Sequence, residues 1–323
     1  MSCVIVTGGY GFIGSNFIKH LFDNTDDIIY NIDSLTYAAD QKNIPEKIRE
    51  SGRYNSIVAD ISEVNFTDSW NSFTTLLRKA KTIYHFAAES HVDNSITGPS
   101  VFVDTNIKGT FNLLEAAKKF NIEFVHVSTD EVYGTLGFFD DPFTEDTNID
   151  PSSVYSASKA GSDLLVKAYS TTYGVKTTIT RCCNNYGPRQ HVEKLLPKVI
   201  TNALNGEKIP VYGKGENVRE WIYVDDHCSG ILAAQEANKE VHDVFNIGSD
   251  VEISNIDLVE KVLAITGKSS KLIEYVTDRP GHDLRYAMNS SKLRKASKWE
   301  PEFNYENFER GLEKTVEWYS SEG

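Results

Sequence analysis

Two carboxylates stand side by side in the triplet Thr129-Asp130-Glu131, directly after an apolar and β-branched run that starts at Val125. The run alternates apolar and small polar residues, which predicts a buried strand entering a turn. Ligands of open α/β sheets bind beyond the carboxyl ends of the strands, so one acid here could donate a proton and the other accept one. The alternative is a strand-ending turn with two solvated acids, which fits the segment taken alone.

A second reactive pair is Tyr155 and Lys159, which stand four residues apart and so share one face of a predicted helix. A free tyrosine has a pKa of about 10, too high for a good base at neutral pH. A nearby ammonium or the positive charge of an oxidised nicotinamide favours the phenolate, which could then take a proton from a hydroxyl as hydride leaves. The alternative is an ordinary pair on a helix surface.

Glycines and one acid predict a dinucleotide site. Gly8, Gly11 and Gly14 lie between a predicted strand and a predicted helix, where they permit a tight turn and a close approach of a pyrophosphate to the helix N-terminus. Asp33 follows Gly14 by 19 residues and would bond the adenine ribose hydroxyls, which favours NAD over NADP. Asp60, at the next strand end, could meet the adenine edge. The alternative is a glycine-rich turn in an α/β protein that binds nothing.

Regular alternation of strands and helices must position these residues. Strands are predicted at 3–7, 28–32, 54–59, 82–86, the run from Val125, and 177–181, and helices at 12–22, 101–120, 153–173 and 305–319. Such βα units indicate a Rossmann-type, doubly wound parallel sheet of the α/β class. Near residue 182 the regularity fades, and 184–187 has a turn-like composition. We therefore expect an NAD-binding domain over 1–182, to which some later segments return, and a smaller, mainly substrate-binding lobe over 183–323.

Composition narrows the class of protein. The 323 residues carry a formal net charge of -13, which argues against nucleic-acid binding. The four cysteines (Cys3, Cys182, Cys183 and Cys228) show neither metal-ligand spacing nor a disulfide framework, so we expect reduced thiols and no metal. No apolar run is long enough for a membrane span and no basic leader precedes the first strand, which predicts a cytoplasmic protein without a membrane partner.

Taken together, these segments resemble the extended short-chain dehydrogenase/reductase family and, within it, the nucleotide-sugar 4,6-dehydratases that act on dTDP-glucose. The resemblance rests on T-G-G-Y-G-F-I-G-S at 7–15, F-A-A-E-S-H-V-D at 86–93, S-T-D-E-V-Y-G at 128–134, R-C-C-N-N-Y-G-P at 181–188 and D-R-P-G-H-D at 278–283. Cys183 stands where the family carries serine. The acid triplet is the specific part, because related epimerases and decarboxylases usually carry other residues there.

The resemblance implies a three-step reaction in one site. Tyr155, assisted by Lys159, would remove the C4 hydroxyl proton as hydride passes to NAD, with Thr129 polarising the C4 oxygen. Glu131 would then take the C5 proton, and Asp130 would protonate the departing C6 hydroxyl. Hydride would return to C6, giving the 4-keto-6-deoxy sugar and water. The two acids must differ in protonation, so their environments should separate their pKa values.

Contact residues are also implied by position. The expected cofactor contacts are Gly8, Gly11, Phe12, Ile13, Gly14, Asp33, Ser34, Leu35, Thr36, Asp60, Ile61, Phe86, Ala87, Ala88, Glu89, Ser90, Thr105, Tyr155, Lys159 and Asn185. The expected contacts to a nucleoside-diphosphate sugar are Ser90, Thr129, Asn184, Lys194, Leu195, Pro210, Val211, Tyr212, Arg219, Asn255, Asp278 and His282. Arg219 suits a pyrophosphate, which it can bind bidentately, and is otherwise a surface arginine.

Some points remain open at this stage. Tyr10 replaces the family's usual small residue beside the glycines and would either close over the cofactor or face solvent. His91 and Asp93 are interpreted as structural residues of a turn. The donor could be UDP-glucose rather than dTDP-glucose, and a 4-epimerase or a non-catalytic NAD-binding regulator are alternative functions. The family is commonly dimeric, so a homodimer is expected through the helices that start near Val101 and Ser153.

Overall fold

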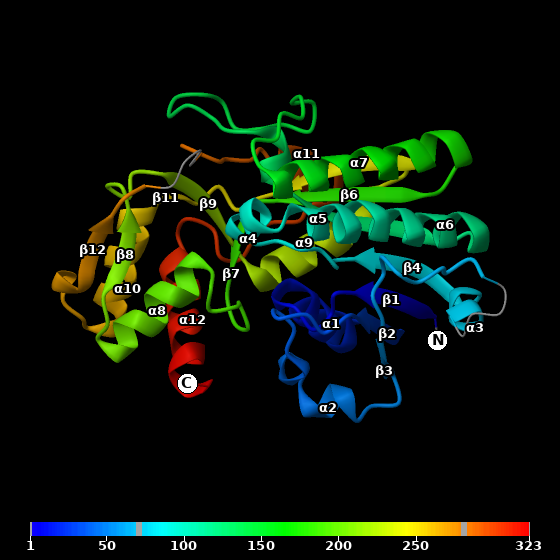
Figure 1. The fold of residues 1–323 in the computed structure, drawn as a ribbon, viewed down its shortest axis with the longest axis horizontal. Helices are drawn as coiled ribbons and strands as arrows, with labels where there is room; N and C mark the ends of the chain where they lie inside the picture. The colour runs from blue at the N-terminus through cyan, green and yellow to red at the C-terminus, as the bar shows by residue number, and fades with distance from the viewer. Residues whose placement is uncertain (1, 69–72, 279–282, 323) are drawn as a thin grey trace.

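The centre of the fold is a parallel sheet of seven strands (Figure 1). The structure, a computed structural model, describes residues 2–68, 73–278 and 283–322. The strands are β1 (Cys3–Thr7), β2 (Ile28–Asp33), β3 (Tyr54–Val58), β4 (Ala80–His85), β5 (Glu123–Thr129), β6 (Thr177–Cys182) and β10 (His242–Ile247). Their order, β3-β2-β1-β4-β5-β6-β10, reverses between β1 and β4, and every neighbouring pair is parallel. The predicted doubly wound fold is thereby confirmed, with its ligand crevice expected beyond these carboxyl ends.

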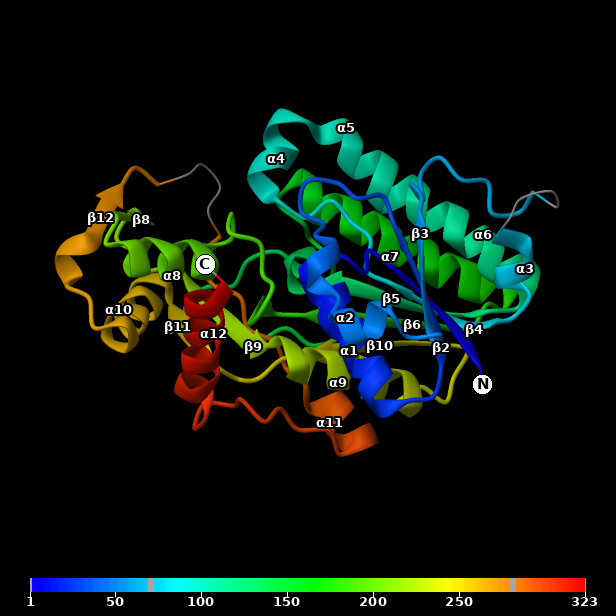
Figure 2. The same ribbon diagram turned by 90° about the horizontal axis from the view of Figure 1, so that it is seen from below.

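Both faces of the sheet are buried because alternate side chains of each strand point to opposite faces. Val4 and Val6 join one apolar core, and Cys3 and Ile5 join another. The first core is completed by α1 (Phe12–Asn24), α2 (Glu46–Arg49), α9 (Val224–Ala237) and α11 (Ser291–Ser297). The second core is completed by α3 (Phe73–Leu77), α6 (Thr110–Phe120) and α7 (Val154–Tyr173). Figure 2 shows α1 and α9 on one side of the sheet, with α6 and α7 on the other.

Two predicted helices are confirmed with more detail than the sequence offered. The segment predicted as one helix over 101–120 consists of α5 (Pro99–Phe102), the π-helical η2 (Val103–Gly109) and α6, preceded by α4 (Val92–Thr97). Helix α7 starts with a capping box, in which the Ser153 hydroxyl accepts a hydrogen bond from the Ser156 N–H at 3.0 Å. It ends at Gly174, whose φ of 71° suits a glycine C-cap.

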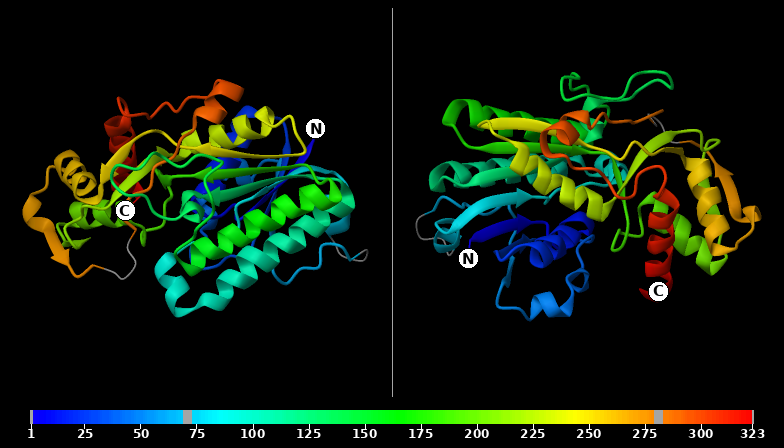
Figure 3. Two further views of the ribbon diagram at one scale, coloured as in Figure 1. Left: turned by 90° about the horizontal axis from the view of Figure 1, so that it is seen from above. Right: turned by 180° about the vertical axis from the view of Figure 1, so that it is seen from behind.

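A second lobe lies beyond the carboxyl ends of the main sheet (Figures 1 and 3). It holds a three-stranded sheet, β11 (Glu252–Ser254), β9 (Val218–Tyr223) and β7 (Asn184–Tyr186), and the pair β12 (Ile273–Val276) and β8 (Ile209–Tyr212). Its helices are α8 (Leu195–Asn205), α10 (Asn255–Thr266) and α12 (Phe308–Glu322), which share one apolar core. The short helices η1 (Gln41–Asn43), η3 (Asp130–Tyr133) and η4 (Ser270–Leu272) lie in connections.

The two lobes are not formed by two consecutive halves of the chain. After β9 the chain returns to the main domain as α9 and β10, and it returns again as α11 before α12. Residues 184–186 were interpreted from composition as part of a turn. They instead form β7, which pairs with β9 in parallel. The predicted C-terminal helix is confirmed, but it begins at Phe308. No helix in the described part of the chain has the length and apolar character needed to cross a membrane.

Candidate active site

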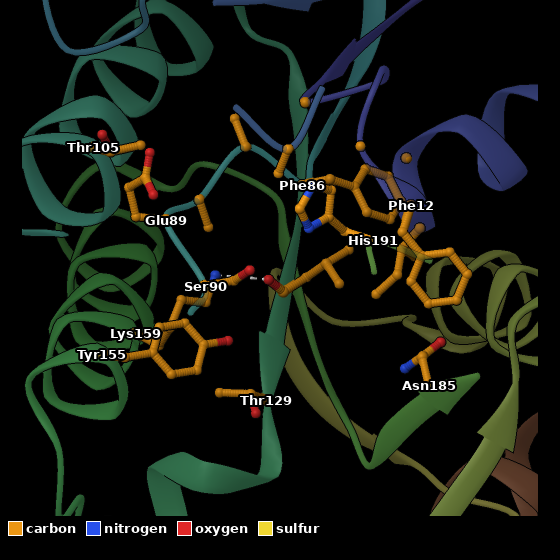
Figure 4. A pocket seen from close by; sticks show the side chains of 18 of the residues that line it. Phe12, Phe86, Glu89, Ser90, Thr105, Thr129, Tyr155, Lys159, Asn185 and His191 are labelled. Atoms are coloured by element: carbon orange, nitrogen blue, oxygen red, sulfur yellow. Dashed lines mark hydrogen bonds between the residues drawn. The ribbon is translucent and has the colours of Figure 1, made fainter. Parts of the chain in front are cut away.

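A cavity of about 410 Å³ lies at the carboxyl ends of the central strands (Figure 4). Its lining starts at the β1–α1 turn, passes the ends of β2 to β6 and finishes on the loop before α8. The switch in strand order between β1 and β4 opens this space. The glycine turn, the acid triplet and the Tyr155/Lys159 pair therefore share one site.

The β1–α1 turn is built to receive an anion. Gly8 has a φ of 70°, and a Cβ on Gly14 would overlap the Gly8 carbonyl oxygen, so neither position tolerates a side chain. Helix α1 begins at Phe12 with no side-chain cap and no acidic residue in its first turn. Its first N–H groups and partial positive charge are consequently available to a pyrophosphate.

Asp33 sits at the end of β2 with both carboxylate oxygens engaged. Oδ2 accepts from the Tyr10 N–H at 2.9 Å and Oδ1 from the Leu35 N–H at 2.8 Å. Burial raises the pKa of Asp33, while these two bonds oppose the rise. Each oxygen retains a lone pair, so the carboxylate has the chemistry for ribose hydroxyls.

Tyr10 fits neither of the positions considered from the sequence. Its side chain is buried, and its hydroxyl donates to the Ser56 hydroxyl at 2.6 Å. It does not line the cavity. Tyr10 is therefore a core residue that links the β1–α1 turn to Ser56 on β3.

A network of buried polar side chains holds the loop after β4 in place. His85 Nδ1 lies 2.7 Å from the Thr7 hydroxyl, and its Nε2 lies 2.9 Å from the Thr110 hydroxyl. Asn106 accepts from the Glu89 N–H at 2.9 Å and donates to the Glu89 carbonyl at 3.0 Å. This loop forms one cavity wall, and its backbone is held in place before any ligand arrives.

Asp130 is the most perturbed acid of the site. It is 2% exposed, and its Oδ1 accepts from the Thr129 hydroxyl at 3.1 Å, while Oδ2 has no hydrogen-bond partner in the described structure. Burial, followed by the charge of Glu131, raises the pKa of Asp130 well above its usual range. A carboxyl group in this setting favours its neutral form, which holds a transferable proton.

Tyr155 and Lys159 project into the cavity from α7 (Figure 4). The Lys159 ammonium donates to the Val127 carbonyl at 2.8 Å, and burial lowers its pKa to about 8. Burial, followed by the charge of Glu131, raises the pKa of Tyr155 well above its usual range. Tyr155 is thus a phenol in the ligand-free protein, and a positive charge placed next to it would favour proton loss.

A second cavity of about 450 Å³ adjoins the first, and Glu131 and Asn184 line both. Arg219 lines the second cavity, where its Nη2 donates to the Asp283 carbonyl at 2.9 Å. Its guanidinium carbon lies 4.6 Å from the centre of the Tyr286 ring. The pre-oriented cation beside Glu131 matches a diphosphate group that would extend from the first cavity.

The structure brings most of the expected contact residues together. Of the expected cofactor residues all but Leu35, whose side chain is 37% exposed, line the first cavity. Of the expected substrate residues, Ser90, Thr129, Asn184, Lys194 and Leu195 line the first cavity, and Asn184 and Arg219 line the second. Pro210, Val211, Tyr212, Asn255 and Asp278 line neither, and the side chain of Val211 packs in the core of the second lobe. His282 lies outside the described residues.

Sequence reasoning missed a polar group at one edge of the cavity. The Tyr37 hydroxyl donates to Glu193 Oε1 at 3.3 Å and accepts from Asn94 Nδ2 at 3.2 Å. His91 Nε2 lies 3.6 Å from Glu193 Oε2, and the His191 ring meets the Tyr37 ring edge to face at 5.8 Å. His191 and Glu193 line the cavity. Their only sequence signal was their place beside Lys194, since the contacts join three segments far apart in the chain.

All four cysteines are free and buried. Cys182 and Cys183 line the cavity, where burial raises the pKa of the Cys182 thiol to about 12. Among the described residues no cluster of His, Cys, Asp and Glu could hold a metal ion. The reactive groups of the cavity are therefore carboxyl, phenol and ammonium.

Comparison with known proteins gives consistent matches over nearly the whole chain. The family described as GDP-mannose 4,6 dehydratase matches residues 5–315. The low-salt glycan biosynthesis protein Agl12 of Haloferax volcanii is 48% identical over 98% of both chains. The dTDP-glucose 4,6-dehydratase of Salmonella typhimurium is 43% identical over 98% of this chain and 92% of its own. The crystal structure of DesIV, a dTDP-glucose 4,6-dehydratase of Streptomyces venezuelae with NAD bound, superposes with a TM-score of 0.90 at 41% identity and covers 99% of this chain and 97% of its own.

Proposed function

Because the chain belongs to the nucleotide-sugar dehydratase family described as GDP-mannose 4,6 dehydratase, we propose that it converts dTDP-glucose into dTDP-4-keto-6-deoxyglucose and water with NAD as its cofactor. One observation carries the proposal. A buried Asp130, whose pKa is raised, stands next to Glu131 in the cavity that also holds Tyr155 and Lys159. Redox chemistry needs only the second pair, whereas elimination of water needs an acid and a base as well.

The cavity suits NAD at three points. The uncapped start of α1 fits the pyrophosphate, and Asp33 at the end of β2 fits the adenine ribose. Lys159 projects from α7 into the far part of the cavity, where it can bond the second ribose. When bound, NAD would accept hydride from C4 of the sugar and return it to C6.

The side chains of the protein move the protons. Tyr155 accepts the proton of the C4 hydroxyl, and Thr129 at the end of β5 donates a hydrogen bond to the C4 oxygen. The resulting C4 carbonyl acidifies C5, from which Glu131 takes a proton. Asp130 gives its proton to the C6 hydroxyl, which leaves as water. Glu131 returns its proton to C5 when C6 receives hydride, and the proton that Tyr155 took up restores that of Asp130. These steps need one neutral and one charged acid, and burial, which raises the pKa of Asp130, suits Asp130 to the neutral role.

The donor nucleotide is tested by side-by-side kinetics with dTDP-glucose and UDP-glucose. We expect the base-induced absorbance of a 4-keto-6-deoxy sugar, with the higher kcat/KM for dTDP-glucose. Glu131→Gln should lower kcat about 10²- to 10⁴-fold, because it lacks the base for C5, while oxidation at C4 continues. Proton exchange at C5 measured in deuterium oxide separates the two steps. Formation of dTDP-galactose without a keto sugar would show that the protein is a 4-epimerase and not a dehydratase. A preference for UDP-glucose would show that UDP-glucose is the donor.

We also propose a homodimer and a division into two lobes. Exposed apolar side chains lie on the following helices: Val103 on η2, Phe111 on α6 and Leu164 on α7. Their exposure supports pairing of two protomers through these helices. Residues 1–182 form the cofactor lobe, which α9 and β10 complete, and residues 183–323 form mainly the lobe for the nucleotide sugar.

A further inference from the structure

Helix α7 carries three buried ionisable residues in one row, and the exposed Lys167 continues the same spacing. Tyr155, Lys159 and Asp163 are spaced four residues apart, so they lie on one helical face. That face packs on β5 and β6, and the three residues are 9%, 4% and 1% exposed. Tyr155 and Lys159 line the cavity, whereas Asp163 lies one turn further along the helix and does not. No step of the proposed reaction uses Asp163.

Asp163 is a fixed negative charge in the core. Arg181 on β6 donates from Nε to Asp163 Oδ2 at 2.9 Å, and His126 Nε2 on β5 lies 3.4 Å from Oδ1. Despite burial, hydrogen bonding to His126 and the charge of Arg181 lower the pKa of Asp163 to about 2. Burial lowers the pKa of His126 to about 4, so this imidazole is neutral at pH 7.

The groups facing this cluster come from every neighbouring element. His85 on β4 lies with its ring 5.3 Å from that of His126 and is also neutral, because burial holds its pKa well below the usual range. The Tyr133 ring of η3 lies 4.7 Å from the Arg181 guanidinium carbon. On β10, burial lowers the pKa of His242. Two cations, Lys159 and Arg181, therefore share one anion.

Lys159 depends on that anion. Its ammonium donates to a neutral carbonyl, that of Val127, and burial disfavours its charged form. The largest opposing influence is the charge of Asp163, followed by Cys182, a thiol that is itself neutral at pH 7 because burial raises its pKa to about 12. Without Asp163, the cluster would hold two buried cations and no counter-charge.

We propose that Asp163 is a positioning residue of the active site, the internal counter-ion that keeps the ammonium of Lys159 charged. Its effect reaches Tyr155 and the cofactor only through Lys159. The assignment rests on the proposed function insofar as Lys159 serves catalysis. Arg181 competes for the same carboxylate, so it weakens the support that Lys159 receives.

This competition predicts opposite changes in the pKa of Lys159 when Asp163 or Arg181 is replaced. Asp163→Asn keeps the shape of the side chain and removes the anion, so the pKa of Lys159 should fall by about 1 pH unit. Arg181→Met removes the competitor and leaves Asp163 to Lys159, so the pKa of Lys159 should stay or rise. Asp163→Asn alone strands Arg181 in the core, which destabilises the fold. The double variant Asp163→Asn/Arg181→Met removes the whole ion pair, a change that folds tolerate better, and its Lys159 pKa should lie below that in Arg181→Met.

The readout is NMR of full-length protein labelled with 13C at lysine Cε, followed from pH 6 to 11 in the absence of substrate. The resonance missing from Lys159→Met belongs to Lys159, and in wild type it should titrate near pH 8, well below surface lysines. Opposite behaviour of the Asp163 and Arg181 variants supports the proposal. A midpoint in the double variant equal to that in Arg181→Met, or a fall in Arg181→Met as large as that in Asp163→Asn, overturns it.

Kinetics give a second and separable result. Lys159 acts in its charged form, so a lower pKa brings the alkaline decline of kcat/KM to lower pH, in Asp163→Asn relative to wild type and in the double variant relative to Arg181→Met. A shifted NMR midpoint in a protein that lacks dehydratase activity would refute the proposed function and leave the counter-ion in place. A normal NMR midpoint in an active enzyme would refute the counter-ion alone.

Discussion

At the scale of single residues, the proton on Asp130 couples catalysis to stability. Burial raises its folded pKa above the unfolded value, so the unfolded chain releases this proton at lower pH than the folded protein does. Stability contributed by this group is therefore full below the usual Asp range and is lost as pH rises toward the raised pKa. Asp130→Asn should abolish water loss, with kcat reduced about 10²- to 10⁴-fold. It should also raise the melting temperature relative to wild type, by more at pH 8 than at pH 5.

Thermal melts of both proteins at the two pH values, alongside Glu131→Gln as control, measure this effect. Glu131 lines both cavities, so its replacement should give a smaller difference between the two pH values. A stability gain for Asp130→Asn that is equal at pH 5 and pH 8 would mean that Asp130 is ionised in the folded protein.

Residue types and spacing were enough to predict that the acids after β5 and the Tyr155/Lys159 pair share the cavity, whereas most other contact residues came from the family resemblance. The row Tyr155/Lys159 and the acids after β5 follow from helix and strand periodicity together with the chain reversal of an α/β sheet. The orientation of Tyr10 did not follow, because its hydroxyl partner Ser56 lies on another strand. The environment of Glu193 was hidden for the same reason, since its contacts come from two other segments.

At the scale of elements, the outer faces of η2, α6 and α7 carry the expected dimer contact. Leu164 is 57% exposed on α7, and Phe111 is 43% exposed on α6, which packs against α7. Leu164→Asp should convert a dimer to a monomer, since a buried unpaired charge is costly at an apolar interface. Light scattering coupled to gel filtration reads the mass directly. Val58→Asp, also at an exposed position (61%) but on β3, is the matched control and should leave the mass unchanged.

A wild-type protein that is monomeric at micromolar concentration would remove the dimer from the proposal.

Long elements were predictable because their periods repeat often enough to stand out, as in α7 and the β1–α1–β2 unit. The three residues of β7 were not, since a strand this short and this polar shows no period. The π-helical turn of η2 lacked a sequence signal for a similar reason, because its residues are ordinary helix residues.

At the scale of the whole molecule, the two lobes should unfold as one unit. Helices α9 and α11 and strand β10 belong to the main domain, yet each is joined in sequence to second-lobe elements. Leu312→Ala, in the fully buried core of the second lobe, should cost about 2–5 kcal/mol. Calorimetry should still show one transition, and hydrogen exchange should report weaker protection of β1 and β5 as well. Tyr305→Ala, at a position 76% exposed, should change neither.

Two separate transitions, with only the second lobe affected by Leu312→Ala, would show that the lobes unfold independently.

Which later segments return to the main sheet could not be predicted in detail, because returning and non-returning segments have the same local composition. Only pairing across the sheet, such as β10 on β6, distinguishes them.

The late arrival of β10 matters while the protein is being made. When β6 leaves the ribosome, its outer edge has no neighbour, and the strand that will cover it lies beyond residues 183–241. At about 5–20 residues per second, translation leaves that edge open for about 3–12 s. An open edge pairs readily with other strands, including those of neighbouring nascent chains. The growing chain is thus most exposed to misassembly while the ribosome translates the first part of the second lobe.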